Sequence, residues 1–308
     1  MIPNAMMKFK TISIFFAICC AICSTANALD IKKNDDGLWV YDVKTLDDAR
    51  AFFKYKAGAL PIISGHRGGK MHGYPENHTS SFEELMKKTP TFLEIDPVKT
   101  KDGVIVLFHD ATLERTTTGK GKMSDLTFAE LRELNLKDGY GVPTEYKVQT
   151  LEEVIKWSRG KCVLNLDNKG VPYEDILALQ EKLGATNIMI TSHSAAHARW
   201  YYDRNKNQMF SAHIRNKKQL EEYKASGIPW KNFIVFIGFS INDENREVYE
   251  FMKKNRVRCM ISVWPQKDFP AAIESGIGII EADLSLELAD LMKEYKSARA
   301  KKQISTDK

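Results

Sequence analysis

The chain has 308 residues, of which 43% are hydrophobic and 28% are charged, with 18 glycines and 10 prolines. These proportions are those of an ordinary globular protein and exclude a disordered chain, a collagen and a coiled coil. The formal net charge is only +5. A nucleic-acid-binding protein concentrates many more cations on one face, so we expect no nucleic-acid partner.

The first 28 residues have the pattern of a secretory signal peptide. Lys8 and Lys10 precede an apolar run over residues 11–23, and Ala26-Asn27-Ala28 is a small-residue cleavage site. The run is shorter than the ~20 residues that span a bilayer as a helix, so we expect no stable membrane span in the mature chain. We predict export to the periplasm or the extracellular space after cleavage near Ala28. Lipoprotein processing at Cys23 is the alternative.

Short runs rich in Ile, Val and Phe then alternate with longer segments of helical periodicity, as in parallel strands joined by helices. The runs predicted to be strands are Leu60–Gly65, Phe92–Val98, Val104–His109, Cys162–Asp167, Ile188–Ser192, Met209–His213, Phe233–Ile237, Arg258–Trp264 and Ile277–Ala282. The linker between the second and third runs is too short for a parallel crossover, so these two are predicted to be antiparallel. The other eight runs predict a (β/α)8 TIM barrel.

One segment of helical periodicity follows each predicted barrel strand. These segments are Ser81–Lys88, Leu151–Ser158, Tyr173–Leu183, Ala195–Asn205, Lys217–Ser226, Glu244–Lys254, Ala271–Ser275 and Leu286–Lys296. A further helix over Thr45–Tyr55 is expected to close the barrel floor. Residues 98–150 are too long for a barrel loop and contain their own hairpin. We therefore predict a single domain over residues 29–308, with an inserted cap subdomain over residues 98–150.

Three acidic residues lie at the ends of predicted barrel strands, where the active sites of TIM barrels lie. Glu94 and Asp96 are two residues apart on one strand, so their carboxylates point to the same side, and Asp167 ends the next barrel strand. Acids that face a barrel interior expected to be otherwise apolar require a neutralising cation. Because carboxylate oxygens suit hard cations, we predict that Glu94, Asp96 and Asp167 bind Ca²⁺ or Mg²⁺.

Four basic side chains accompany these acids. His66 and Arg67 end the first barrel strand, Lys169 follows Asp167, and the predicted hairpin returns His109 toward the acids. Two histidines can exchange a proton as base and acid, Arg67 can neutralise a phosphate, and Lys169 can stabilise charge that develops in the transition state. We predict that all four are catalytic residues of a reaction at phosphorus.

Several short motifs follow one another along this part of the chain. They are His66-Arg67-Gly68, Pro75-Glu76-Asn77, Glu94-Ile95-Asp96, Thr100-Lys101-Asp102-Gly103, His109-Asp110, Leu113-Glu114-Arg115-Thr116-Thr117 and Thr150-Leu151-Glu152-Glu153. Together they resemble the signature of the glycerophosphodiester phosphodiesterases, a family of the PI-phospholipase C-like phosphodiesterase superfamily. The resemblance implies a TIM barrel with a cap and Ca²⁺- or Mg²⁺-dependent hydrolysis of glycerophosphodiesters to glycerol 3-phosphate and an alcohol.

The resemblance also assigns residues. It implies that His66 and His109 are the acid–base pair, that Arg67 contacts phosphate, and that Glu94 and Asp96 bind the metal. The chain departs from the family at Asp167, where the family usually has Glu, so the third predicted ligand is shorter by one methylene group.

Further residues are predicted to lie at the mouth of the barrel. We assign Glu76, Asn77 and Trp264 to substrate binding; for Trp264, packing at the rim is an equal alternative. His72 and His78 are interpreted as loop residues on the rim, and the inserted His78 is expected to shift the start of the following helix.

Two more histidines, His193 and His213, follow barrel strands and are interpreted as rim residues without a special role.

Three functions are compatible with this sequence. The first is an exported, metal-dependent phosphodiesterase that acts on small-molecule glycerophosphodiesters, which are deacylated phospholipids. The second is a phospholipase D-like or phosphoinositide-cleaving enzyme of the same fold, which predicts an apolar groove or an exposed aromatic ridge at the mouth. The third is a non-catalytic phosphodiester-binding protein, which the short Asp167 side chain favours. The sequence leaves open the leaving alcohol, the choice of metal, the nucleophile and the oligomeric state.

Overall fold

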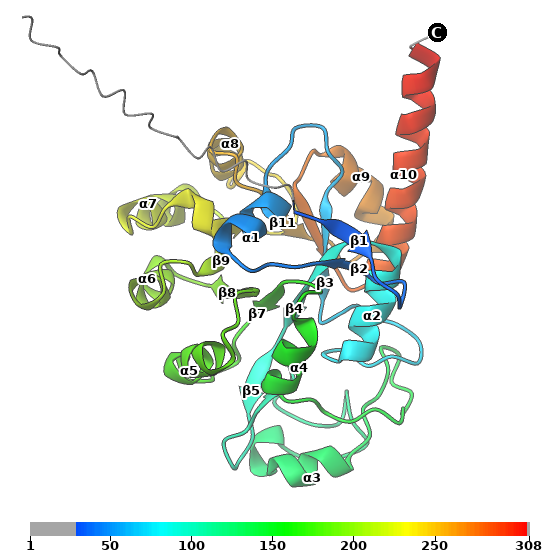
Figure 1. Cartoon of the computed structure of the whole chain (residues 1–308), viewed down its shortest axis with the longest axis vertical. Coiled ribbons are helices and arrows are strands. Elements are labelled where there is room, and N and C mark those ends of the chain that lie inside the picture. The colour runs from blue at the N-terminus through cyan, green and yellow to red at the C-terminus, as the bar shows by residue number, and fades with distance from the viewer. Residues whose placement is uncertain (1–28, 307–308) are drawn as a thin grey trace, which may run out of the picture.

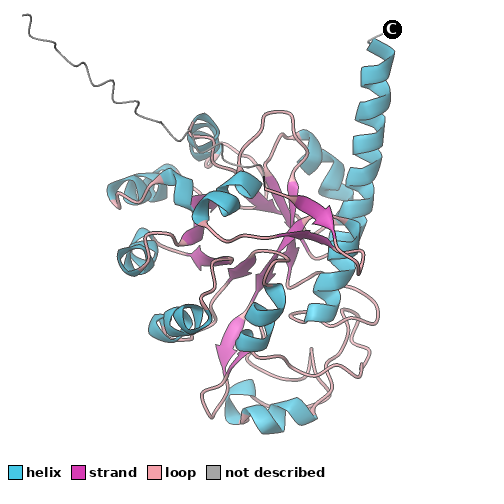
Figure 2. Ribbon diagram, viewed as in Figure 1, coloured by secondary structure: helices cyan, strands magenta, loops and turns pink. Residues whose placement is uncertain are grey.

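A computed structural model of the chain describes residues 29–306, and the predicted leader lies outside the described residues. Eight strands form a closed barrel in which each strand pairs in parallel with its neighbours, so the predicted TIM barrel is confirmed (Figures 1 and 2). The barrel strands are β3 (Ile62–His66), β4 (Thr91–Ile95), β7 (Leu164–Leu166), β8 (Ile188–Ser192), β9 (Met209–His213), β10 (Phe233–Phe236), β11 (Cys259–Ser262) and β12 (Ile279–Ala282).

A helix follows each barrel strand in the described part of the chain, and these helices surround the barrel (Figure 2). They are α2 (Thr79–Lys88), α4 (Leu151–Ser158), α5 (Tyr173–Leu183), α6 (Ala195–Arg204), α7 (Lys217–Ala225), α8 (Arg246–Lys254), α9 (Phe269–Glu274) and α10 (Ser285–Thr306), and the short 3₁₀ turns are η1 (Met123–Asp125), η2 (Trp230–Asn232) and η3 (Gln266–Asp268). Local chemistry sets their ends: α4 begins at a capping box of Thr150 and Glu153, and α5 ends at Gly184 with φ of 58°. Within residues 29–306, no helix has both the length and the apolar character that crossing a membrane requires.

The segment before the barrel covers its floor, in agreement with the predicted position of the first helix. It contains a two-stranded sheet of β1 (Ile31–Lys33) and β2 (Trp39–Tyr41), followed by α1 (Leu46–Phe53). The hydroxyl of Tyr41 donates a hydrogen bond to the carbonyl of Thr91, the first residue of β4, at 2.8 Å. The Tyr41 ring stacks on Phe52 with 4.0 Å between ring centroids. These contacts close the amino-terminal end of the barrel and leave the opposite end for the site.

The cap (residues 98–150) projects from the barrel beside α4 (Figure 1). The strand predicted over Phe92–Val98 is divided: β4 ends at Ile95, and β5 (Pro97–Lys99) pairs with β6 (Ile105–Leu107) in the antiparallel hairpin that the short linker predicts. The division follows from Asp96, because its backbone N–H donates to the side chain of Asn77 at 3.1 Å instead of to a neighbouring strand. The cap also carries α3 (Phe128–Glu133). The cap has a separate core, whose buried residues are Val106, Phe108, Leu113, Met123, Leu131 and Val148.

The barrel interior contains polar side chains, so the expectation that it is apolar apart from the acids was wrong. Glu281 accepts hydrogen bonds from Ser262 at 2.7 Å and Ser64 at 3.3 Å, and Thr191 donates to Asn165 at 3.1 Å. Hydrogen bonds of this kind remove much of the cost of burying polar groups. Burial nevertheless raises the pKa of Glu281, since it disfavours the charged carboxylate.

Candidate active site

Three carboxylates meet at the carboxyl ends of β4 and β7. Glu94, Asp96 and Asp167 each offer one oxygen atom, and these oxygens lie within 4.8 Å of one another. Glu94 and Asp96 are buried, whereas Asp167 is partly exposed. Glu94 lies in β4 and Asp96 directly follows it at i, i+2 spacing, and the parallel pairing of β4 with β7 brings Asp167 to the same end. The cluster therefore contains the three acids that the sequence assigned to the metal.

The acids are suited to a hard divalent cation. Burial, together with repulsion from Asp96 and other nearby acids, raises the pKa of Glu94 well above its ordinary value. The Oδ1 atom of Asp96 is buried and has no hydrogen-bond partner, although Lys169 Nζ lies 3.2 Å away in an ion pair. Unshared carboxylate oxygens are the donors that Ca²⁺ and Mg²⁺ prefer. The donor set thus fits a divalent cation and gives no preference between these two.

Arg67 and Lys169 are held against these acids. Arg67 Nε lies 3.1 Å from Asp96 Oδ2, and the Arg67 backbone N–H donates to Glu94 Oε2 at 3.1 Å. Lys169 Nζ lies 2.6 Å from Asp167 Oδ2. Burial opposes the charge of Lys169, but the attraction of Asp96 and Asp167 is larger in sum, so the pKa of Lys169 is raised. Lys169 is therefore charged, and both side chains are positioned to meet an anion at the mouth.

A strained turn fixes the position of Arg67. Its φ is 53°, a conformation that non-glycine residues adopt rarely, and Gly68 follows with φ of 88°. A Cβ atom on Gly68 would lie 2.5 Å from both Phe82 Cδ1 and Ser81 Oγ. The loop is therefore pressed directly against the first turn of α2.

Each of the two predicted catalytic histidines has its Nδ1 atom bound to a carboxylate. His66 Nδ1 lies 2.5 Å from Asp283 Oδ1, and His109 Nδ1 lies 2.8 Å from Asp110 Oδ1. Burial opposes the ionisation of Asp283, but the hydrogen bond from His66 and the positive charges nearby together outweigh it, and the pKa of Asp283 is lowered. Hydrogen bonds from Arg115 lower the pKa of Asp110. Two ionised carboxylates therefore orient the two rings and leave each Nε2 atom for a ligand.

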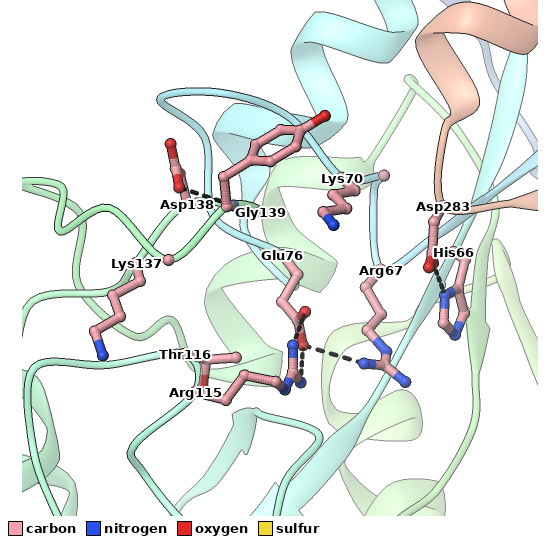
Figure 3. A pocket seen from close by; sticks show the side chains of 13 residues that line it. His66, Arg67, Lys70, Glu76, Arg115, Thr116, Lys137, Asp138, Gly139 and Asp283 are labelled. Carbon is pink, nitrogen blue, oxygen red and sulfur yellow. Dashed lines mark hydrogen bonds and ion pairs between the residues drawn. The ribbon is translucent and has the colours of Figure 1, made fainter. Parts of the chain in front are cut away.

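Glu76 links the cap to the barrel. Arg115 of the cap donates to both Glu76 oxygens, at 2.6 and 2.8 Å, and Arg67 Nη1 donates to Glu76 Oε1 at 3.3 Å. Arg115 Nε also donates to Asp110 Oδ2 at 2.6 Å. Burial opposes the ionisation of Glu76, but the two arginines outweigh it and lower its pKa. Glu76, assigned to substrate binding from the sequence, is here engaged by two arginines and positions both of them (Figure 3).

Asn77 and His78 are also engaged in the structure. The Asn77 amide donates to Asp96 Oδ2 at 2.8 Å, so this residue, too, positions a site carboxylate. His78 is buried, and its Nδ1 accepts a hydrogen bond from Ser80 N at the start of α2. The interpretation of His78 as a rim residue was wrong, because the inserted imidazole acts as the N-cap and the helix starts earlier than predicted, at Thr79.

Trp264 lies beside His66, with 4.9 Å between ring centroids. Trp264 is 38% exposed. The ring of Phe239, which is 62% exposed, lies 6.5 Å from the Trp264 ring between centroids. Trp264 therefore presents an open aromatic surface next to the site.

His193 has contacts that the sequence did not reveal. Its Nε2 lies 3.0 Å from Asp167 Oδ1, and its Nδ1 lies 3.3 Å from His213 Nδ1.

Three residues at the site were missed by sequence reasoning. Asp110 and Arg115 stand inside the quoted motifs, so their positions in the sequence were a usable signal. Asp283 immediately follows β12, and a polar residue at a barrel strand end is the same signal that identified the acids. All three bind another site residue, and such pairings come from tertiary structure.

A cavity of about 450 Å³ opens at this site, between the barrel and the cap (Figure 3). His66, Arg67 and Asp283 line it from the barrel, and Arg115 lines it from the cap. A smaller cavity of about 80 Å³ lies deeper, among Glu94, Asp167, Glu281 and neighbouring polar residues. His109 lines a third, very small cavity. The cavity of about 450 Å³ offers room for a small molecule whose anionic part meets Arg67.

Comparison with known proteins agrees with this chemistry. The family model of the glycerophosphoryl diester phosphodiesterase family matches residues 66–228. A glycerophosphodiester phosphodiesterase from Caldanaerobacter subterraneus subsp. tengcongensis is 34% identical over 246 residues, which are 72% of this chain and 94% of that protein. Glycerophosphodiester phosphodiesterase 1 of Mus musculus is 40% identical over 109 residues, 34% of this chain, and the matched region spans only 33% of the mouse protein.

A solved structure is similar over most of the chain. It is a glycerophosphoryl diester phosphodiesterase from Parabacteroides distasonis, with a TM-score of 0.80 and 41% sequence identity, covering 83% of this chain and 94% of that one. The chain described here belongs to the glycerophosphoryl diester phosphodiesterase family.

Proposed function

We propose that the chain is a divalent-cation-dependent hydrolase that converts glycerophosphodiesters to sn-glycerol 3-phosphate and an alcohol, with His66 and His109 as the acid–base pair. The observation that carries this proposal is that both imidazoles have Nδ1 bound to a carboxylate near the three acids. His66 Nε2 lies 3.9 Å from Glu94 Oε2, and the residue before His109, Phe108, donates its backbone N–H to the carbonyl of Asp96 at 2.9 Å. Each ring then offers Nε2 to the substrate. Family membership supports the same reaction class.

The two histidines transfer protons, and Arg67 and Lys169 stabilise negative charge. One imidazole, unprotonated at Nε2, accepts the proton of the nucleophile, which is water or the glycerol hydroxyl of the substrate, and the other, protonated at Nε2, gives its proton to the leaving oxygen. If the glycerol hydroxyl attacks first, water then opens the cyclic phosphate with the two imidazoles in exchanged roles, so that glycerol 3-phosphate is the product on either route. Arg67 and Lys169 neutralise negative charge on the phosphoryl group. When bound by the three acids, a divalent cation would polarise the phosphoryl oxygens. Asp110 and Asp283 keep the rings oriented throughout.

Hydrolysis of glycerophosphocholine with identification of both products tests the proposal. We expect glycerol 3-phosphate and choline, loss of turnover in chelator, and recovery with added Ca²⁺ or Mg²⁺. His66→Ala and His109→Ala should each lose at least ~100-fold in kcat, the lower end for acid–base catalysis. Turnover that persists in chelator refutes the metal role, and a His109→Ala variant as active as the parent refutes the acid–base role of His109. A parent that binds glycerophosphocholine but does not hydrolyse it in the presence of divalent cation supports a binding protein.

A second candidate function is cleavage of acylated substrates. The exposed Phe239 and Trp264 favour it, because they supply aromatic surface next to His66 of the kind that an acyl chain requires. Comparing lysophosphatidylcholine with glycerophosphocholine separates the two. Preference for the lysolipid, abolished in Phe239→Ser, supports the second function, whereas preference for glycerophosphocholine supports the first.

We also propose that the protein is exported, on the pattern of residues 1–28. Cell fractionation and sequencing of the mature amino terminus test this. A mature chain that begins at Leu29 supports signal cleavage, a lipid-modified Cys23 supports lipoprotein processing, and an unprocessed chain in the cytoplasm refutes both.

A further inference from the structure

The 450 Å³ cavity extends from the phosphate end of the site into a space between two loops (Figure 3). One loop follows β3 and includes Lys70, and the other is residues 137–141 of the cap. The loops touch through their backbones, because Gly139 N donates to Met71 O at 3.1 Å. A Cβ atom on Gly139 would lie 2.7 Å from Met71 N. This close contact fixes the cap loop as one wall of the cavity.

Two lysines, Lys70 and Lys137, line this space without an acidic partner. Among residues 29–306, neither Lys70 nor Lys137 forms an ion pair with a carboxylate. Lys70 Nζ lies 4.8 Å from the centroid of the Tyr140 ring, and Lys137 Nζ donates to the carbonyl of Glu114 at 2.6 Å. Two cationic side chains thus lie beyond Arg67 along the cavity wall.

The acids that line the cavity form no ion pair with these two lysines, because each has other partners, although the charge of Lys70 contributes to the lowered pKa of Asp283. Glu76 binds two arginines, and Asp283 binds His66. Asp138 accepts hydrogen bonds from the backbone N–H groups of Tyr140 and Val142, both at 2.9 Å, and of Gly73 at 2.8 Å. Its two oxygens therefore organise the loops. The part of a ligand that extends into this space meets two lysines that are not paired with a carboxylate of the described chain, and the Lys137 ammonium would exchange its bond to the Glu114 carbonyl for the ligand.

The charges of a glycerophosphodiester indicate which part of the substrate extends into the space lined by Lys70 and Lys137. A glycerophosphodiester has one charge at the diester phosphate, which Arg67 meets, and its glycerol carries hydroxyl groups only. A second negative charge belongs to the leaving alcohol. We propose that the preferred substrates are glycerophosphodiesters whose leaving alcohol carries an additional anionic group, a phosphomonoester or a carboxylate, and that Lys70 and Lys137 bind it. This inference rests on the proposed function and deepens it.

Two matched substrate pairs test the inference. Glycerophosphoinositol 4-phosphate differs from glycerophosphoinositol by one phosphomonoester, and glycerophosphoserine differs from glycerophosphoethanolamine by one carboxylate. We expect kcat/KM to be about tenfold higher for the more anionic member of at least one pair, as for one charged hydrogen bond of ~1.4 kcal/mol. The pair that responds identifies the anionic group. The ratio should fall as salt screens the interaction.

Lys70→Met and Lys137→Met, alone and combined, test whether these lysines cause the preference. The ratio within the responding pair should approach one in the double variant and recover in Lys70→Arg with Lys137→Arg. Lys182→Met, which removes a lysine paired with Glu152 on the outer surface, is the matched control and should keep the parental ratio.

The failures of the two proposals can be told apart. If no glycerophosphodiester is hydrolysed in the presence of divalent cation, the proposed function fails and the inference fails with it. If both members of each pair are hydrolysed equally well, only the inference fails. If the lysine variants lower kcat/KM equally for both members of the pair, the lysines serve the diester phosphate, and the inference is again refuted.

Discussion

The bond between His66 and Asp283 offers a direct test of the site, because two substitutions separate charge from orientation. The atoms His66 Nδ1 and Asp283 Oδ1 are 2.5 Å apart. Asp283→Asn keeps an oxygen that accepts the Nδ1 hydrogen bond but removes the charge, whereas Asp283→Ala removes both. If His66 carries a proton during the reaction, the two variants should lose different amounts of activity.

The magnitudes follow from the geometry. Two unit charges 4 Å apart interact by about 4 kcal/mol at the effective dielectric constant of a protein surface. The Asp283 side chain is 46% exposed, so solvent screens most of this, and we take about 1–2 kcal/mol for the charge. Asp283→Asn should therefore lower kcat roughly 5–30-fold. Asp283→Ala also frees the ring and should lower kcat about 10²–10³-fold, within the range of acid–base catalysis.

The assay is steady-state release of glycerol 3-phosphate, with circular dichroism to verify folding. Asp290→Asn removes an exposed acid that is paired with Lys88 on the outer surface, and it serves as the control with unchanged kcat. Asp283→Ala with parental kcat would refute the role of this bond. Equal losses in the Asn and Ala variants would show that the charge alone matters.

Three further predictions concern the metal cluster, the cap of α2 and the turn after β3. Asp167→Asn should weaken Ca²⁺ or Mg²⁺ binding at least ~10-fold in calorimetry, because it removes one of three anionic oxygens; unchanged affinity would exclude this residue as a ligand. Burial lowers the pKa of His78 from 6.5 to about 4, so the unfolded chain takes up a proton first as the pH falls below 6.5. The parent should then lose about 3 kcal/mol more stability between pH 7 and pH 4 than His78→Asn, which keeps a neutral cap, and equal losses in urea unfolding would contradict this. Gly68→Ala should cost about 2–4 kcal/mol through strain and overlap with Phe82, whereas Gly73→Ala, which has positive φ but open space, should cost about 1 kcal/mol; equal melting temperatures would refute the steric argument.

Hydrophobic periodicity was sufficient to predict the barrel. Runs such as Met209–His213 coincide with their strands because apolar residues on parallel strands are buried on both faces. The division of the second run could not be predicted, since Asp96 leaves the ladder by bonding to Asn77, which is distant in sequence. The polar barrel interior was missed for the same reason. Glu281 is tolerated there because Ser64 and Ser262 bind it from neighbouring strands.

The acids of the candidate site could be predicted from the sequence, because the i, i+2 spacing and the position at a strand end bring Glu94 and Asp96 together. The carboxylate partners of the histidines could not be predicted in this way. Asp283 lies 217 residues from His66 in sequence, and no local pattern joins the two. His193 was interpreted as a rim residue because its contact with Asp167 depends on the position of a third strand end.

The stem of the cap has a consequence for how such enzymes diversify. The chain leaves the barrel at Pro97 and returns at Thr150, and these ends are tied by the bridge between Val106 and Thr150 and by the bond from Leu107 N to Gln149 O. Residues 98–149 are therefore joined to the barrel by two adjacent segments of chain, and they have their own apolar core. Replacing only the loop of residues 137–141 would exchange one wall of the cavity and would leave every barrel strand, His109 and Arg115 unchanged. Substrate range could thus evolve by change in this loop while the residues proposed to carry the reaction stay in place.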